Sequence, residues 1–219
     1  MPRVPEPEVM GAAEEARAYG EGDFRRVNAA FARRLAGAAG STRGRALDLG
    51  TGPGDIPVLF CGLAPGWRVT ALDLSEAMLD LARARVSAAG LSSRIELLRR
   101  DAKAPRLGSR RFDLVFSNSL LHHLEDPAPF WAHVRRLARS GAAIVVMDLR
   151  RPPDRARARK LVRLHASGAS PLLRRLFHDS LLAAFTPGEV RQQLAAAGLG
   201  GLRVRATTDR HMVISGRRR

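Results

Sequence analysis

Short apolar runs alternate along the chain with stretches of helical periodicity. The expected strands cover residues 45–49, 68–72, 94–99, 112–117 and 142–148, and the expected helices between them cover 53–63, 75–89 and 129–138. The helix over 75–89 is the clearest, because Ser75 is a good N-cap and Gly90 a good stop signal. Strands that alternate with helices form βαβ units, so the pattern predicts an α/β protein with a doubly wound, mostly parallel sheet.

The two ends of the chain have a different pattern. Residues 12–39 have helical periodicity, and residues 153–182 form a long, basic, helical stretch that is followed by a helix over 187–197. Residues 201–206 and 212–215 then predict two strands that pair antiparallel because their connection is short. The run AAIVVMD at 142–148 is apolar throughout, which predicts a place in the middle of a parallel sheet. We expect seven strands in a single domain over residues 1–219.

Composition supports a globular protein. The chain has 219 residues, of which 45% are hydrophobic and 26% charged, which is enough apolar material for a core. No apolar stretch approaches the roughly 18 residues of a membrane span. The first residues lack the apolar region of a secretory signal, and Cys61 is the only cysteine. We therefore expect a cytoplasmic protein without a disulfide and without a membrane partner.

The formal net charge of +16 raises the question of a nucleic-acid partner. All of the basic residues except Lys103 and Lys160 are arginine, as a biased coding composition would produce. Nine bases nevertheless fall within one short stretch over 150–175, and such a field attracts polyanions. Composition alone leaves two interpretations open, compositional drift and an RNA-binding surface.

The strongest local signal is the segment ALDLGTGPG at residues 46–54. It ends a strand and then places Gly50, Gly52 and Gly54 at alternate positions before a helix, which lets a ligand approach the backbone closely. A dinucleotide loop would carry Gly or Ala three positions after Gly52, where this chain has Asp55. The loop therefore favours a nucleoside ligand without phosphates, and the carboxylate of Asp48 suits a positive group on it.

Acidic residues follow the first three expected strands. Asp73 ends the second strand, where a carboxylate can accept hydrogen bonds from both ribose hydroxyls. Asp101 follows the third strand and can reach a purine amino group, with the backbone amide of Ala102 available to the ring. Three acids at neighbouring strand ends, Asp48, Asp73 and Asp101, all face one glycine loop and predict a nucleoside site.

These motifs carry a family resemblance. The segments DLGTGPG, ALDLSEAML, RRDA, FDLVFSNSLLHHLEDP and AAIVVMDL resemble the successive motifs of class I S-adenosylmethionine-dependent methyltransferases. More narrowly, they resemble the small-molecule, type 11-like members related to quinone-ring methyltransferases. The resemblance covers residues 45–150 and implies a Rossmann-like, seven-stranded sheet with a reversed last strand. It also implies S-adenosyl-L-methionine as cofactor and S-adenosyl-L-homocysteine as product.

The resemblance implies a set of cofactor-binding residues. The set is Asp48, Gly50, Gly52, Asp73, Leu74, Met78, Asp101, Ala102 and Asn118. In the family pattern, Gly50 and Gly52 contact the methionine part of the cofactor and Asp73 its ribose. Met78 covers the adenine face, and Asn118 lies under the cofactor.

Methyl transfer needs a nucleophile aligned behind the methyl–sulfur bond, and a base only if that nucleophile carries a proton. His122 and His123 are the candidate catalytic residues. The segment at 117–120 reads SNSL instead of the Asn/Asp-Pro-Pro-aromatic motif of enzymes that methylate exocyclic amines of nucleic acids. The consecutive residues His178, Asp179 and Ser180 cannot form a triad, because their side chains point apart. No His, Cys or acid spacing predicts a metal site.

The remaining segments are expected to form a lid on the substrate site. Residues 12–39 form its N-terminal part and residues 153–186 its C-terminal part, around a core over 45–150; residues 187–219 close the domain. Lid residues expected at the substrate are Tyr19, Phe24, Asn28, His165 and His178. The sequence thus predicts methyl transfer to a small molecule. Two alternatives stay open: an RNA- or ribosome-directed methyltransferase that docks through 150–175, and a non-catalytic cofactor-binding subunit.

Overall fold

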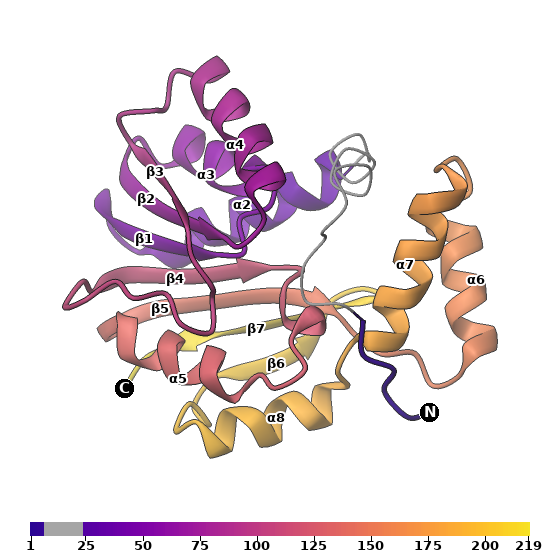
Figure 1. The fold of residues 1–219 in the computed structure, drawn as a ribbon. Coiled ribbons are helices and arrows are strands. Elements are labelled where there is room, and N and C mark those ends of the chain that lie inside the picture. The colour runs from indigo at the N-terminus through magenta and orange to yellow at the C-terminus, as the bar shows by residue number, and fades with distance from the viewer. Residues whose placement is uncertain (7–23) are drawn as a thin grey trace.

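The computed structural model describes residues 1–6 and 24–219. Its centre is a seven-stranded sheet in the order β3-β2-β1-β4-β5-β7-β6 (Figure 1). The strands are β1 (Arg43–Leu49), β2 (Gly66–Asp73), β3 (Ile95–Arg99), β4 (Phe112–Asn118), β5 (Ala138–Leu149), β6 (Arg203–Ala206) and β7 (His211–Arg217). Strands β1 to β5 pair in parallel, and β7 runs antiparallel to both β5 and β6. The predicted seven-stranded sheet with a reversed last strand is confirmed.

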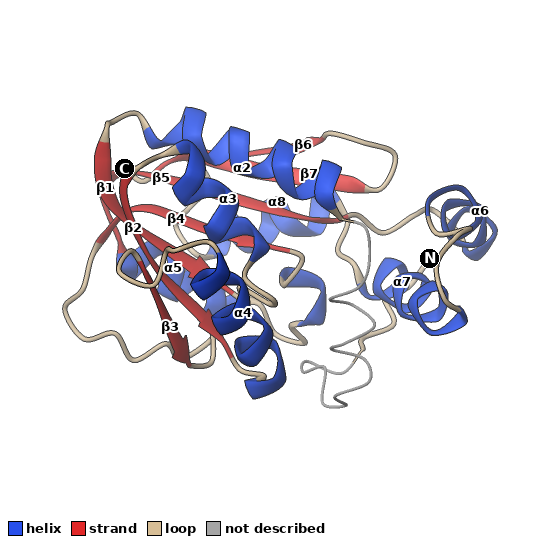
Figure 2. Ribbon diagram, turned by 90° about the horizontal axis from the view of Figure 1, so that it is seen from above, coloured by secondary structure: helices blue, strands red, loops and turns tan. Residues whose placement is uncertain are grey.

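Helices cover both faces of the sheet. They are α2 (Arg25–Ala39), α3 (Asp55–Leu63), α4 (Glu76–Ala88), α5 (Ala128–Leu137), α6 (Arg155–His165), α7 (Pro171–Ala183) and α8 (Pro187–Ala196), with a 3₁₀ turn η1 (Leu121–His123). Helices α2, α3 and α4 lie on one face and α5 and α8 on the other (Figures 1 and 2). Each face therefore has its own apolar core, as a doubly wound fold requires.

The core on the α2–α3 face contains an aromatic cluster. Phe116 of β4 contacts Phe31 of α2 and Phe60 of α3, with ring centroids 6.5 Å and 6.0 Å apart. The Phe60 ring also meets Trp67 of β2 edge-on at 5.7 Å. All four side chains are buried, so these rings join the two helices to β2 and β4, the neighbours of β1, which leads into the glycine loop.

Two details of the fold differ from the sequence-based expectations. The segment 153–182 is two helices, because Ser170 accepts a hydrogen bond from the Leu173 backbone and Pro171 follows at the first helical position. The apolar strand β5 is inside the sheet but at the boundary of its parallel part, because one neighbour, β4, is parallel and the other, β7, is antiparallel. Part of the predicted helix over 12–39 lies outside the described residues.

Helices α6 and α7 form a hairpin that stands beyond one edge of the sheet (Figure 2). Its inner surface packs Ala158 and Leu161 against Leu181 and Leu182, together with Leu149 at the end of β5. The hairpin is thus fixed to the carboxyl end of β5. Within the described residues, no helix is both long and apolar enough to cross a membrane.

We expect Phe116→Ala to lower the free energy of unfolding by about 3–5 kcal/mol, because it removes a ring at the centre of a fully packed cluster. Chemical denaturation followed by circular dichroism measures the change. Leu164→Ala is the control: this side chain is 63% exposed, and its truncation should cost less than about 0.5 kcal/mol. If both variants lost the same free energy of unfolding, the aromatic cluster would not be a main source of stability.

Candidate active site

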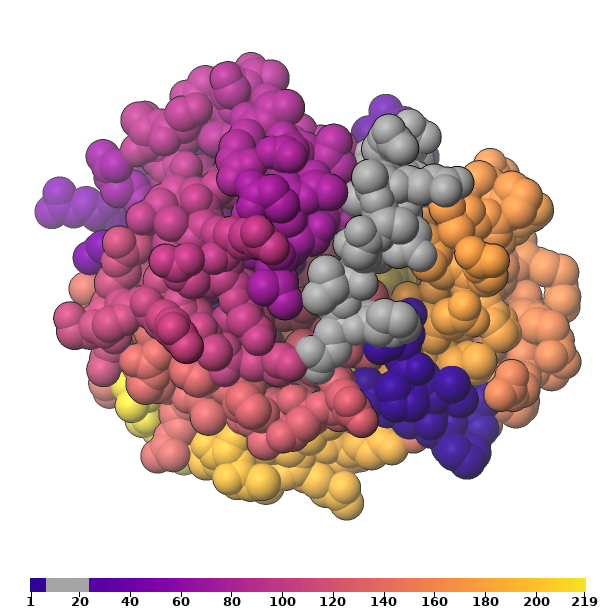
Figure 3. All heavy atoms as spheres, in the orientation of Figure 1, coloured from indigo at the N-terminus to yellow at the C-terminus, as the bar shows by residue number. Residues whose placement is uncertain are grey.

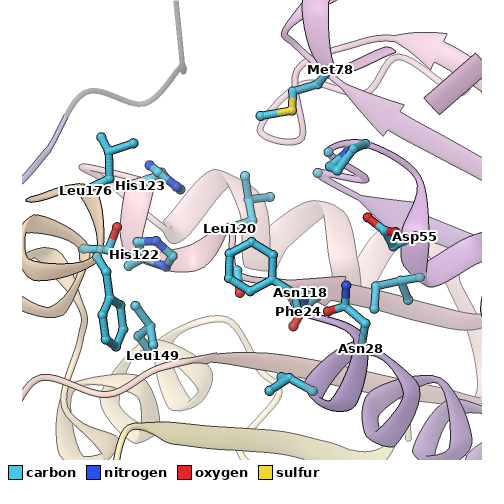
Figure 4. Close-up of a pocket in the computed structure, with 18 of the residues that line it drawn as sticks. Phe24, Asn28, Asp55, Met78, Asn118, Leu120, His122, His123, Leu149 and Leu176 are labelled. Carbon is cyan, nitrogen blue, oxygen red and sulfur yellow. The ribbon is translucent and has the colours of Figure 1, made fainter. Parts of the chain in front are cut away.

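A cavity of about 860 Å³ opens at the carboxyl ends of the parallel strands. Each of the strands β1 to β5, or the loop that follows it, contributes lining residues, and the opposite wall comes from the start of α2 and from the α6–α7 hairpin. Figure 4 shows His122 and His123 beside Leu149 and Leu176 at one end, and Met78 and Asp55 at the other. The cavity therefore joins the glycine loop to the histidine pair.

The glycine loop has the backbone conformation that its sequence predicts. Gly50 and Gly52 have φ angles of +76° and +55°, which L side chains rarely adopt. A Cβ on Gly50 would lie 2.9 Å from the Leu120 side chain, whereas a Cβ on Gly52 would enter open space in the cavity wall. Gly50 is needed for packing, and Gly52 leaves room for a ligand.

The Asp73 carboxylate connects the second strand to this loop. It accepts hydrogen bonds from the backbone N–H of Gly52 at 2.7 Å and of Ser75 at 2.9 Å. Burial raises the pKa of Asp73, although those backbone donors oppose the rise. Asp73 therefore shapes the loop as well as lining the cavity, a role that the sequence analysis did not assign to it.

Three buried oxygens in the cavity wall have no hydrogen-bond partner within residues 1–6 and 24–219: Oδ2 of Asp48, Oγ1 of Thr51 and Oδ1 of Asn118. Burial raises the pKa of Asp48 to about 8; the nearby Thr51 hydroxyl opposes the rise, and the Asp73 carboxylate adds to it. An unpartnered carboxyl oxygen and an unpartnered amide oxygen form a site for a cationic hydrogen-bond donor.

The other predicted cofactor residues also line the cavity. Leu74, Met78, Asp101 and Ala102 lie in its wall next to the ends of β2 and β3. The Asp101 carboxylate accepts a hydrogen bond from the Lys103 backbone at 2.8 Å and so folds its own loop. The structure brings the whole predicted set together, and its contact with the cofactor stays a prediction.

Of the predicted lid residues, Phe24, Asn28 and His165 line the cavity. His178 is not among the lining residues; its Nδ1 lies 3.2 Å from the Asp179 carboxylate. Tyr19 lies outside the described residues. Arg210 and His211, at the start of β7, also line the cavity and were not predicted.

The histidine pair has an acidic partner. Nδ1 of His122 lies 2.6 Å from Oδ1 of Asp148, and the Asp148 carboxylate accepts the Leu121 backbone N–H at 2.6 Å. The His122 and His123 rings are stacked, with centroids 4.3 Å apart. Burial by itself lowers the pKa of His122, but the Asp148 carboxylate outweighs it and the net direction is upward. Nε2 is the ring atom of His122 that remains for other partners.

Residues 1–6 complete the histidine end of the cavity. Arg3 donates hydrogen bonds to the backbone oxygens of Ala183, His122 and Leu124 at 2.6–2.8 Å, and its guanidinium carbon lies 4.0 Å above the Phe185 ring. This segment lies against α7 on the surface (Figure 3). It brings Oε1 of Glu6 to 3.4 Å from Nε2 of His122 and 3.2 Å from Nδ1 of His123.

Comparison with known proteins agrees with this geometry. Residues 47–146 match the family model described as a methyltransferase domain. This match supports a class I S-adenosylmethionine-dependent methyltransferase. The cofactor of this family is S-adenosylmethionine, whose positively charged amino group is a hydrogen-bond donor of the kind that the unpartnered oxygens of Asp48 and Asn118 suit.

Individual relatives differ in what they act on. The chain is 25% identical to a demethylmenaquinone methyltransferase of Bacteroides fragilis over 157 residues, 68% of this chain and 64% of the relative. It is 43% identical to a release factor glutamine methyltransferase of Gloeobacter violaceus over 88 residues, 40% of this chain and 28% of the relative. The chain thus spans less than two thirds of either relative.

A solved structure supports the fold. A candidate S-adenosylmethionine-dependent methyltransferase from Methanococcus maripaludis superposes on this one with a TM-score of 0.74 at 16% identity. The match covers 100% of this chain and 98% of that chain. At this identity the likeness concerns the fold alone.

The affinity for S-adenosylmethionine should depend on pH through Asp48. The pKa of this carboxyl is about 8 in the free protein, and a bound cation favours its ionised form. Between pH 6 and 8 the dissociation constant should fall by up to about tenfold per pH unit, and above pH 8 it should level off. Calorimetric titrations across this range measure the slope. Asp48→Asn should make the dissociation constant nearly independent of pH in this range. An unchanged slope in that variant would show that another group causes the pH dependence.

Asp73→Ala should weaken the binding of S-adenosylmethionine by about 1.5–3 kcal/mol, or about 10- to 150-fold. The variant loses the predicted acceptor for the ribose and the observed acceptor for the Gly52 N–H. Calorimetry at constant pH measures the loss. Asp80→Ala removes an exposed acid from α4 and should bind as the wild type does. Wild-type affinity in the Asp73 variant would refute the assignment.

Proposed function

We propose that this methyltransferase transfers the methyl group of S-adenosylmethionine to a small-molecule acceptor held between the glycine loop and the histidine pair. The observation that carries the proposal is that one cavity contains both the unpartnered oxygens of Asp48 and Asn118 and the rings of His122 and His123. One end suits the charged part of the cofactor, and the other leaves room for a second molecule.

In this proposal the chain positions two reactants. When bound, S-adenosylmethionine would supply a methyl group on a positively charged sulfur: a lone pair of the acceptor atom would form the new bond to the methyl carbon, and the sulfur would keep the electron pair of the broken bond as a thioether. Asp48 and Asn118 hold the methionine part, and Asp73 holds the ribose. Their buried, preformed arrangement fixes the direction from which an acceptor atom can approach the methyl group.

The part of the cavity that would hold the acceptor has apolar walls and polar groups at its far side. Phe24, Leu149, Leu176 and Phe177 supply apolar surface, and the histidine pair supplies ring nitrogens. This combination suits a ring-bearing acceptor with a polar substituent. The similarity to a demethylmenaquinone methyltransferase supports a quinone-like acceptor, and the departure from the nucleic-acid amine motif at 117–120 agrees with it.

The basic surface supports a second candidate, methyl transfer to RNA. Arg151 does not contribute to it, because its buried guanidinium pairs with Glu189 at 2.5 Å. The other bases of the α6–α7 hairpin are at least partly exposed: Arg155, Arg157, Arg159, Lys160, Arg163, Arg174 and Arg175. These side chains could bind phosphates, but phosphate contacts do not distinguish one base from another.

Incubation with S-adenosylmethionine labelled in the methyl group separates the two candidates. We expect label in members of a panel of hydroquinones and phenols, and no label in total RNA. Gly52→Val should abolish the transfer because the new side chain would enter the cavity. Thermal unfolding checks that this variant folds. Label in RNA, lost when Arg155, Arg157 and Arg159 are neutralised, would overturn the proposal in favour of RNA.

A further inference from the structure

Three potential metal ligands meet at the histidine end of the cavity. They are Oε1 of Glu6, Nε2 of His122 and Nδ1 of His123, and all lie within 4.8 Å of one another. We propose that these atoms bind a divalent transition-metal ion, with Zn²⁺ the best match to two imidazoles and one carboxylate. Whether the ion binds is independent of the proposed function. Only the role of the ion in methyl transfer rests on the proposed function.

The distances from Glu6 to the two histidines match those between ligands that share one ion. Oε1 of Glu6 lies 3.4 Å from the His122 nitrogen and 3.2 Å from the His123 nitrogen. The first distance exceeds the usual 2.7–3.2 Å of an N–H···O hydrogen bond, and the second is at the upper limit of that range. Two ligands at about 2.0–2.1 Å from a tetrahedral Zn²⁺ lie about 3.3 Å from each other. Oε1 of Glu6 is buried and has no hydrogen-bond partner among the residues that the structure describes.

Outer contacts hold two of these ligands in place. Asp148 is bonded to Nδ1 of His122, which leaves Nε2 as the metal-binding nitrogen of that ring. Ser180 donates a hydrogen bond at 3.3 Å to Oε2 of Glu6, the oxygen that does not face the histidines. A carboxylate on the far nitrogen of a histidine and a hydrogen bond on the far oxygen of a carboxylate are typical of metal centres.

The local charge also favours a cation. Glu6 and Asp148 place two carboxyl groups around two imidazoles in a largely buried space. The nearby Arg3 directs its donors to backbone oxygens. A divalent ion between the rings would therefore balance the two acids where water is scarce.

The ion would have a place for an acceptor. Three protein ligands leave at least one coordination position open, as in catalytic rather than structural zinc sites. His122 and His123 line the cavity, so that position can be reached from the acceptor side. The ligand class we expect there is an oxygen group of the acceptor, a hydroxyl or a carboxylate. Sequence spacing gave no sign of this site, because Glu6 lies far from the histidines in the chain.

Metal binding tests the proposal directly. Untagged full-length protein, stripped with a chelator, should take up one equivalent of Zn²⁺ in competition with a chromogenic chelator. Co²⁺ should give visible absorption bands of a four- or five-coordinate site. Glu6→Ala and His123→Gln should weaken binding by more than about 100-fold, and Asp148→Asn by about 10- to 100-fold, as expected for loss of an outer contact.

His133→Gln is the matched control, because this histidine lies on α5 and its Nδ1 contacts the Pro129 carbonyl oxygen. It should bind Zn²⁺ as the wild type does. Circular dichroism shows whether each variant folds; if Glu6→Ala does not, His123→Gln decides. Absence of Zn²⁺ and Co²⁺ binding, or equal binding in the ligand variants and the control, overturns the metal site. Methyl transfer by the metal-free protein would leave the proposed function standing.

Discussion

The parallel arrangement of β1 to β5 is the constraint on which the site depends. Because these strands run in the same direction, the loops that follow them lie at one edge of the sheet. Asp48, Asp73, Asn118 and Asp148 all lie at or next to a strand's carboxyl end there, although they come from distant parts of the chain. The reversed β7 adds its first residues to the same edge. Strand direction alone thus concentrates the polar groups.

The interior of this site contrasts with the surface of the protein. The chain has a formal net charge of +16, but the polar groups of the cavity wall are mainly carboxylates, amides and imidazoles. Both Asp48 and Asp73 have raised pKa values because burial removes their carboxylates from water. A site with buried carboxyl groups favours cationic ligands whatever the charge of the outer surface is. Net charge is therefore a poor guide to what such a cavity binds.

Site residues that lie at the carboxyl end of a strand could be predicted from the sequence, because the strands themselves were predicted. Site residues that only tertiary contacts bring to the cavity could not. Asp48, Asp73 and Asp101 were found because each follows a strand near the glycine loop. Asp148 also ends a strand and lies in the AAIVVMDL segment, but nothing in the sequence was a reason to assign it a role. Glu6 carries no local signal, since only the fold brings it to the histidine pair. Continuous apolarity placed β5 inside the sheet but could not distinguish an antiparallel neighbour from a parallel one.

The contacts of Arg3 have a consequence for the order of folding. They join residues 119 to 180 positions apart, and they connect the first residues to backbone that follows β4 and to the last residue of α7. Contacts between such distant parts of a chain cost the most loop entropy and form after more local ones. The sheet and the glycine loop rest on shorter-range pairings, so the nucleoside end of the cavity would form first. The histidine end would be completed last, when the N-terminal segment docks.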